Sequence, residues 1–273
     1  MKYKEFIQDL SQIAGLKVIN TIARSADYVL RERSYGNNPR HRYDCYLHKI
    51  NIGNRPKIIF LYGGNWRSGA RRDYRFVADS FCSLGFDVFI PDYRLYPEVR
   101  FGQILGDIRV AVDDIMASIT DGPIFLVGHS AGAQLGALLT LNERLLQSPQ
   151  RITGFVGMAG PYDFFPYTED FHWELFAPAE KYPESQPVNF VRPDAPPLYL
   201  LHGKEDKRVR RGHSKSLMEK QRDAGGEASR KVYNGMGHTD IIVSLSRIYR
   251  GKSEVLRDIN HFISATEEIT KGV

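Results

Sequence analysis

Residues 124–132 read Ile-Phe-Leu-Val-Gly-His-Ser-Ala-Gly, and they decide the fold expected for this chain of 273 residues. Four apolar residues of a buried strand lead into a turn where Gly128 and Gly132 stand two positions either side of Ser130. A helix of small and apolar residues is expected next, over Ala131–Leu145. At such a turn the backbone is strained and the serine side chain is pushed out above the sheet. The pattern favours a serine nucleophile over a tight turn with an idle serine.

The same alternation of apolar run, glycine-rich turn and helix recurs along the chain and predicts a mostly parallel sheet. The expected buried strands are Lys57–Tyr62, Phe86–Pro91, Ile124–Gly128, Ile152–Met158, Pro197–His202 and Arg230–Tyr233. Tyr28–Arg33 and Tyr43–His48 alternate in polarity, which predicts an antiparallel edge pair. Further helices are expected over Asp73–Leu84, Gln103–Ile119 and Ser253–Ile269. We therefore predict one α/β domain over residues 1–273, with about eight strands and helices on both faces of the sheet.

Two segments stand outside this rhythm. Residues 1–40 are expected to form an N-terminal arm, amphipathic over residues 1–24. Residues 161–196 are rich in proline and aromatic residues, with seven aromatics between Pro161 and Phe176. Such a density argues against disorder and favours a lid insertion over a site. A second hydrophobic patch packed on the body is the alternative.

The overall composition excludes several classes of protein. Lys and Arg number 37 against 32 Asp and Glu, and hydrophobic residues make up 42% of the chain. These values exclude a disordered chain, a coiled coil and a collagen-like polymer. A net charge of +5 is mild for this length and does not predict nucleic-acid binding. The arginines at 67, 71, 72 and 75 form either a solvated helix entry or a basic rim that attracts anionic substrates.

The sequence also bears on location and partners. Cys45 and Cys82 are expected to be reduced and packed, and the N-terminus lacks the features of a signal peptide, so we expect a cytoplasmic protein. Residues 122–142 carry no Asp, Glu, Lys or Arg, but Pro123 and the turn at Ser130 argue against a stable membrane span. Membrane-surface association through residues 1–24 stays an alternative. The oligomeric state stays open, with a homodimer among the alternatives.

A nucleophilic serine needs a base and a group that orients the base. His238 lies in a glycine-rich loop after the expected strand Arg230–Tyr233, and Asp206 lies just past another strand end. The chain order Ser, Asp, His is the order of an α/β-hydrolase sheet. Glu205 competes with Asp206 for the role of the acid. The other histidines after Ser130 are expected in a lid, a turn or a helix: His172, His202, His213 and His261.

The charge of a tetrahedral intermediate needs hydrogen-bond donors. Tyr62-Gly63-Gly64-Asn65-Trp66 follows an expected strand, and paired glycines let backbone amides approach an oxyanion. We assign this role to the amides of Gly63, Gly64, Asn65 and Ala131, against the alternative of a plain Gly-Gly turn. The substrate pocket is expected to involve Trp66, His129, Tyr162, Phe164 and Phe165.

These residues resemble the α/β-hydrolase superfamily, and more narrowly the hormone-sensitive-lipase-like carboxylesterases and kynurenine formamidases. Pro91–Glu98 is similar to the family segment Asp-Tyr-Arg-Leu-x-Pro-Glu, and residues 160–163 resemble the Gly-x-Tyr-Asp turn of the formamidase-like members. The likeness runs from about Asp44 to Phe262. It implies a triad of Ser130, Asp206 and His238, and an N-terminal arm that helps to cover the site. One departure is Tyr62, which replaces the histidine of the family's His-Gly-Gly-x-Trp pattern.

Three functions follow as hypotheses. The first is a carboxylesterase that cleaves uncharged short-to-medium or aryl carboxylic esters through an acyl-enzyme. The second is an aryl formamidase that uses the same residues on an N-formylkynurenine-type amide. The third is a non-catalytic ligand-binding α/β-hydrolase fold. None of them needs a cofactor or a metal, and the sequence has neither a Cys/His metal spacing nor a phosphate-binding loop.

Overall fold

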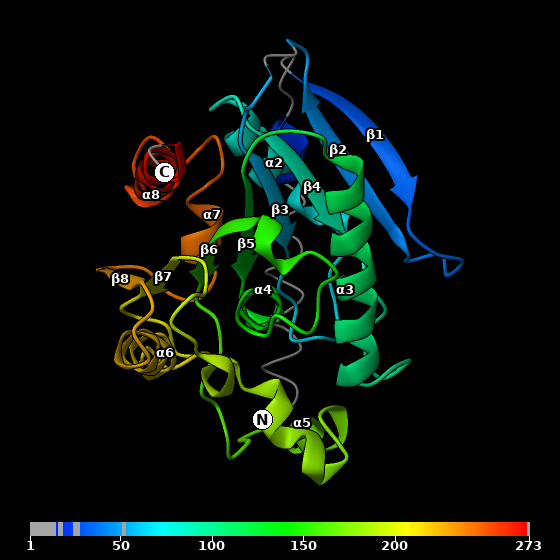
Figure 1. Cartoon of the computed structure of the whole chain (residues 1–273), viewed down its shortest axis with the longest axis vertical. Helices are drawn as coiled ribbons and strands as arrows, with labels where there is room; N and C mark the ends of the chain where they lie inside the picture. Colours follow the sequence, from blue (N-terminus) through cyan, green and yellow to red (C-terminus); the bar gives the residue numbers. More distant parts are fainter. Residues whose placement is uncertain (1–14, 16–18, 24–27, 51–52, 272–273) are drawn as a thin grey trace.

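The computed structural model describes residues 15, 19–23, 28–50 and 53–271, without the side chains of residues 270 and 271. In these residues an eight-stranded sheet has the order β1-β2-β4-β3-β5-β6-β7-β8 (Figure 1). The strands are β1 (Tyr28–Ser34), β2 (Arg42–His48), β3 (Lys57–Leu61), β4 (Asp87–Pro91), β5 (Ile124–His129), β6 (Ile152–Met158), β7 (Leu198–Gly203) and β8 (Ala228–Tyr233). β2 runs antiparallel to both β1 and β4, and the other neighbours are parallel. The predicted sheet and its antiparallel edge are confirmed.

Helices cover both faces of this sheet, as the sequence predicts. They are α2 (Arg75–Cys82), α3 (Phe101–Ser118), α4 (Ala131–Leu141), α5 (Asp170–Leu175), α6 (Gly212–Asp223), α7 (Asp240–Val243) and α8 (Val255–Lys271). Phe155 of β6 packs so closely on Gly136 of α4 that a Cβ there would lie 2.7 Å from its ring. Phe125 of β5 points to the opposite face and meets Phe262 of α8 at 6.4 Å between ring centroids. Figure 1 shows α3 and α4 on one side and α8 on the other.

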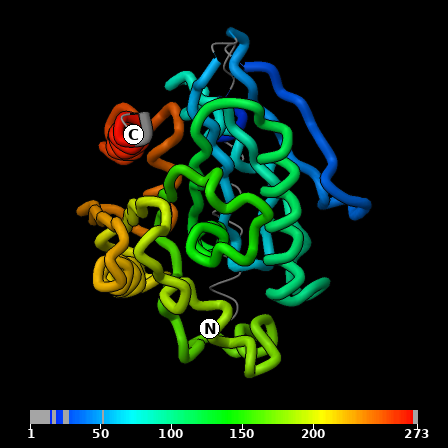
Figure 2. Tube along the Cα trace, viewed as in Figure 1, coloured from blue at the N-terminus to red at the C-terminus, as the bar shows by residue number. Residues whose placement is uncertain are grey.

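The aromatic segment at residues 161–196 follows β6 and contains little regular structure. Its elements are α5 and two 3₁₀ turns, η3 (Ala179–Ser185) and η4 (Pro187–Phe190). Figure 2 shows the segment in yellow-green at the end of the molecule opposite β1. It is tied to the body through Gln134 of α4, which accepts from Trp66 Nε1 at 3.1 Å and donates to the carbonyl of Ser185 at 2.7 Å. The segment is therefore a packed aromatic cluster on the body.

Several expectations concern the termini and the surface. The amphipathic face expected for residues 1–24 lies mostly outside the described residues, which include only 15 and 19–23 of that stretch. Within the described ranges, no helix has both the length and the apolar character needed to cross a bilayer. Cys45 and Cys82 are buried and unpaired, as predicted.

Candidate active site

The nucleophile position is a sharp turn between β5 and α4. Ser130 has φ 54° and ψ −123°, in the positive-φ region that most residues avoid. A Cβ at Gly128 would lie 2.5 Å from the carbonyl oxygen of Gly132, and a Cβ at Gly132 would lie 2.1 Å from that of Leu61. The strand and the helix can therefore approach only because these two positions are glycines. This close approach fixes where the Ser130 hydroxyl stands.

Ser130, His238 and Asp206 form one line of hydrogen bonds. The Ser130 Oγ lies 2.9 Å from His238 Nε2, and His238 Nδ1 lies 2.8 Å from Asp206 Oδ2. Because a carboxylate only accepts, Nδ1–H donates to Asp206, and Nε2 is left to accept the serine proton. Ser130 is 8% exposed and His238 is 9% exposed. The structure thus brings the three predicted residues together in the order that activates a serine.

Asp206 is held by more groups than the sequence indicated. Its Oδ1 accepts from the backbone amides of Arg208 and Val209, both at 2.9 Å, while His202 Nε2 lies 3.2 Å from its Oδ2. Burial by itself would raise the pKa of Asp206, but hydrogen bonds from His202 and His238 outweigh it and hold this pKa well below its usual value. Asp206 therefore stays ionised beneath the imidazole. The spacing of four residues from His202 was the only sequence signal for this contact.

His129 supports the base through the backbone. Its Nε2–H donates to the carbonyl of His238 at 3.0 Å. Burial, and then the nearby His238, lower the pKa of His129 to about 3. The ring is therefore neutral, and its Nδ1 lies close to Gly63, where a Cβ would come within 3.0 Å. His129 fixes the position of the His238 loop next to the nucleophile.

The loop after β3 has the shape of an anion-binding turn. Gly64, Asn65 and Trp66 all have positive φ, at 139°, 53° and 57°. The amides of Arg67 and Ser68 both donate to the carbonyl of Gly64 at 3.0 Å. In the described part of the chain, the amides of Gly63, Gly64, Asn65 and Ala131 have no backbone acceptor. These amides are free to donate to a ligand beside Ser130.

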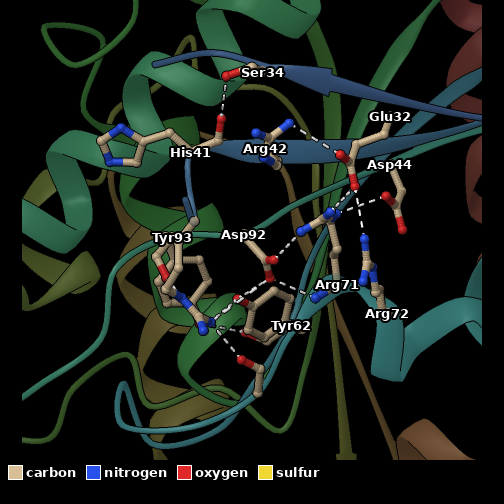
Figure 3. Close-up of polar contacts among 12 residues, drawn as sticks. Glu32, Ser34, His41, Arg42, Asp44, Tyr62, Arg71, Arg72, Asp92 and Tyr93 are labelled. Carbon is tan, nitrogen blue, oxygen red and sulfur yellow. Dashed lines mark hydrogen bonds and ion pairs between the residues drawn. The ribbon is translucent and has the colours of Figure 1, made fainter. Parts of the chain in front are cut away.

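The Tyr62 side chain connects this loop to charged groups (Figure 3). Its hydroxyl donates to Asp92 Oδ1 at 2.8 Å and accepts from Arg40 Nη2 at 3.2 Å. The same Arg40 nitrogen donates to the carbonyl of Gly69 at 2.6 Å. Asp92 is fixed in turn by Arg71, whose amide and Nη1 lie 2.7 and 2.5 Å from its two oxygens. The phenol thus connects the start of the loop to its end through two charged groups.

The arginine cluster is partly solvated and partly paired within the fold: Arg67 and Arg72 are exposed, while Arg71 is buried. Arg71 is 5% exposed and pairs with Glu32, Asp44 and Asp92, so three carboxylates offset its charge (Figure 3). Arg72 pairs with Glu32 at 3.1 Å. The other two guanidinium groups lie over aromatic rings, Arg67 over Phe171 and Arg75 over Tyr28. Arg71 is therefore not available to an anionic substrate, whereas Arg67 and Arg72 stay at the surface.

A small pocket of about 60 Å³ opens beside Ser130. It is lined by Gly63, Gly64, Asn65, Ser68, Gly69, Asp73, Tyr74, His129, Ser130, Arg208, His238, Thr239 and Ile242. Of the residues expected in the pocket, His129 is present. Tyr74, Thr239 and Ile242 were not foreseen, although each follows within twelve residues of a predicted site residue.

The four aromatic residues expected in the pocket lie elsewhere. Trp66 packs on Phe164 and Phe176, at 6.1 and 5.1 Å between ring centroids. Tyr162 is fully buried, and Phe165 is 52% exposed on the outer side of the aromatic segment. The positions of these residues differ from the expectation because their aromatic rings pack against one another and do not line the pocket beside Ser130.

The competing site residues are placed apart from the triad. Glu205 is exposed, and His261 is exposed on α8. His172 is buried in the aromatic segment, and His213 contacts the carbonyl of Asp163. Over the described ranges, no three His, Cys, Asp or Glu side chains are grouped as metal ligands.

The sheet order, the strained serine turn after β5 and the hydrogen-bonded His and Asp on later loops define the α/β-hydrolase fold. Within that class, the family model BD-FAE matches residues 43–221, and the chain belongs to this family.

Individual relatives agree with this assignment. The chain is 25% identical over 270 residues to isoprenylcysteine alpha-carbonyl methylesterase ICME of Arabidopsis thaliana, covering 88% of this chain and 63% of that protein. It is 25% identical over 158 residues to kynurenine formamidase of Danio rerio, covering 57% of this chain and 54% of that protein. The chain thus spans less than two thirds of the length of these relatives. Inhibited esterase B from Lactobacillus rhamnosis shares the fold, with 17% identity, 98% coverage of both chains and a TM-score of 0.80.

Proposed function

We propose that the protein is a serine carboxylesterase that cleaves small uncharged esters through an acyl-enzyme. The observation that carries this proposal is the hydrogen-bonded line from Ser130 Oγ through His238 to Asp206, with distances of 2.9 and 2.8 Å. The family assignment and the names of the methylesterase and formamidase relatives support hydrolysis of an acyl bond.

The reaction would run in two halves. His238 Nε2 takes the Ser130 proton while Oγ attacks the carbonyl carbon of the ester. The negative charge on the carbonyl oxygen is stabilised by the amides of Gly64, Asn65 and Ala131, with that of Gly63 beside them. His238 then gives its proton to the departing alcohol. Water repeats the sequence on the acyl-enzyme and releases the acid.

The size of the pocket supports a small acyl group. A site for one water needs roughly 10–15 Å³ of accessible space, and a pocket of about 60 Å³ favours a small acyl group over a long chain. Tyr74 and Ile242 supply its apolar walls. We therefore narrow the expected range to formyl, acetyl and similar short acyl groups, with aryl or methyl leaving groups directed outwards.

An aryl formamidase is the second candidate. Two observations favour it: the similarity to kynurenine formamidase over 158 residues, and an acyl pocket too small for a long chain. A formyl group needs almost no acyl space. Arg71 does not supply the basic partner for the amino-acid part of such a substrate, because it is already paired with three carboxylates.

The test combines active-site labelling with a substrate series. A fluorophosphonate should label wild-type protein at Ser130, and Ser130→Ala should lose both the label and turnover. Turnover of p-nitrophenyl esters should fall beyond the acetyl and propionyl members. Higher kcat/KM for N-formylkynurenine than for any ester would select the formamidase instead.

The same labelling and turnover experiment also tests the non-catalytic alternative. A folded wild-type protein that neither reacts with the fluorophosphonate nor turns over any ester or formamide would contradict the enzyme proposal. Ser148→Ala, at a serine remote from the site in sequence, is the matched control and should keep full labelling and activity.

Other parts of the proposal concern the setting of the enzyme. We place it in the cytoplasm as one α/β-hydrolase domain, with the aromatic segment and the N-terminal arm beside the substrate entrance. The two unpaired cysteines support that location. A homodimer is supported by edge strand β1, whose Val29 and Leu30 are 43% and 46% exposed. Light scattering on the eluted protein and cell fractionation would check these points.

A further inference from the structure

A second cavity lies at the start of α6, apart from the pocket at Ser130. It has a volume of about 580 Å³ and is more open to solvent than that pocket. Its lining residues are Lys204, Asp206, Arg210, Arg211, Gly212, Lys215 and Arg230. Five of these seven are cationic. The loop between β7 and α6 therefore contributes to both sites, since its Arg208 lines the pocket at Ser130.

The one acid in this cavity, Asp206, supplies a single negative charge against five cations. The side chain of Asp206 is fully buried, and its oxygens already accept from His238, His202 and two backbone amides. The Asp206 oxygens therefore already have hydrogen-bond donors on the side of the loop that faces Ser130. A ligand entering the cavity would meet the five cationic side chains.

These cations also lack carboxylate partners of the kind found elsewhere in the fold. Arg230 donates to the hydroxyl of Ser214 at 2.8 Å and to the carbonyl of Arg211 at 3.1 Å, both neutral acceptors. Lys215 has only an exposed contact with Glu219 at 3.5 Å. Within the described ranges, Lys204, Arg210 and Arg211 have no carboxylate within ion-pair distance.

The arrangement is electrostatically unfavourable when empty. Burial, followed by the charge of Arg211, lowers the pKa of Arg230 below its ordinary value. Cations gathered in one place repel one another and attract counter-ions more strongly than the same charges spread over the whole surface. In contrast, the buried Arg71 has three carboxylate partners.

We propose that this cavity is a second binding site, separate from the catalytic pocket, for the phosphate group of a soluble phosphorylated compound. Guanidinium and ammonium donors suit phosphate, because its oxygens can accept from several of them at once, including in bidentate pairs with arginine. A carboxylate offers fewer oxygens and less charge. The site is open to solvent, so the experiment includes a vesicle arm that distinguishes a soluble phosphate from a lipid headgroup.

The experiment uses the full chain and pyrophosphate as the probe. Isothermal titration should show saturable binding with one site per chain, and the thermal midpoint should rise above that seen in sodium chloride of equal ionic strength. Lys204→Ala/Arg211→Ala removes two exposed cations from the cavity. It should weaken binding by about tenfold or more, because each charge-assisted hydrogen bond contributes strongly to affinity.

A matched double variant controls for net charge. Arg144→Ala/Lys252→Ala also removes one exposed arginine and one exposed lysine, at positions outside the cavity, and should bind as the wild type does. Equal weakening in both double variants would overturn the proposal, as would no binding by the wild type. Binding to vesicles containing phosphatidic acid, without binding of pyrophosphate, would also overturn it and point to a lipid surface. Repeating the titration with Ser130→Ala tests the cavity independently of the proposed esterase activity, because pyrophosphate binding should not depend on Ser130.

Discussion

Tyr62 stands where the family pattern has a histidine, and it supports the following loop through a phenol instead of an imidazole. Its ring is fully buried between Tyr93 and Tyr74, at 4.8 and 5.3 Å between ring centroids. Its hydroxyl extends beyond that stack to Asp92 and Arg40. The ring is held by apolar packing, while the hydroxyl holds the charged groups that secure the loop of Gly63–Gly69.

Removing that hydroxyl should affect both stability and catalysis. Tyr62→Phe leaves a buried carboxylate and a guanidinium without one partner, so the free energy of unfolding should fall by about 1–3 kcal/mol. The loop amides should lose their alignment, so kcat should fall while KM changes little. Urea unfolding and steady-state kinetics on p-nitrophenyl acetate measure both effects.

Tyr233→Phe provides the comparison for this prediction. The Tyr233 hydroxyl donates to Asp258 at 2.8 Å, away from the oxyanion loop. This variant should lose stability and keep kcat. A Tyr62→Phe enzyme with unchanged kcat would show that the loop holds its shape without the phenol.

The sequence predicted that Ser130, Asp206 and His238 act together, and the structure places them in one line of hydrogen bonds, but most of the side chains around them were not predicted. Ser130, Asp206 and His238 each follow a strand end, and strand ends of a parallel sheet meet at one edge. Arg40 acts through contacts with segments far away in the chain, such as Tyr62, which no local pattern encodes. His202 lies only four residues before Asp206, but that spacing alone does not predict their contact. The aromatic residues expected in the pocket contact one another instead, and composition does not predict which ring a buried ring will contact.

At the scale of elements, the junction of β5 and α4 is the tightest constraint on the site. A Cβ at Gly132 would lie 2.1 Å from the carbonyl of Leu61, whereas a Cβ at Gly106 of α3 meets nothing within 4 Å. Gly132→Ala should therefore destabilise the protein by several kcal/mol, at the upper end of single substitutions. Gly106→Ala should stabilise it by about 0.5–1 kcal/mol, since alanine favours a helix interior.

Thermal and urea unfolding of the two variants test this contrast. Because the substitution is the same, a general effect of adding a methyl group would shift both in one direction. Shifts of the same sign, or an unaffected Gly132→Ala protein, would contradict the assigned geometry.

Strands were easier to predict than the connections between them. The buried runs match the observed strands to within about two residues, because apolar residues on both faces mark a strand covered by helices. The helix expected over Ala131–Leu145 ends at Leu141, and the helix expected from Asp73 begins as the 3₁₀ turn η1 (Arg71–Tyr74). Residues 161–196 lacked periodicity because their short turns are held by aromatic contacts instead of by an amphipathic face.

For the whole molecule, two buried histidines make stability depend on pH. Burial lowers the pKa of His129 to about 3 and that of His172 to about 4, against about 6.5 in an unfolded chain. Between about pH 4 and 6.5 both therefore bind a proton only after unfolding, so acid favours the unfolded state. Stability should be greatest above pH 6.5 and fall by about 1.4 kcal/mol per pH unit for each histidine below it.

Urea unfolding from pH 5 to pH 7 measures this dependence. His172→Phe keeps an aromatic ring in the aromatic segment and removes one titrating group. The change in the free energy of unfolding per pH unit should therefore become smaller by the contribution of one histidine. An unchanged slope would show that His172 is not neutral and buried in the native protein.

The burial of both cysteines makes the protein a convenient host for a reporter dye. Cys45 and Cys82 are 2% and 1% exposed, and burial raises the pKa of Cys45 to about 12. Thiol reagents near neutral pH should therefore leave the native chain unmodified. A cysteine introduced at Phe165, whose ring lies 6.0 Å from that of Trp173, would be the one reactive thiol and could carry a dye that tryptophan quenches. Its brightness during turnover would record any opening of residues 161–196 in real time, with no native residue removed except Phe165.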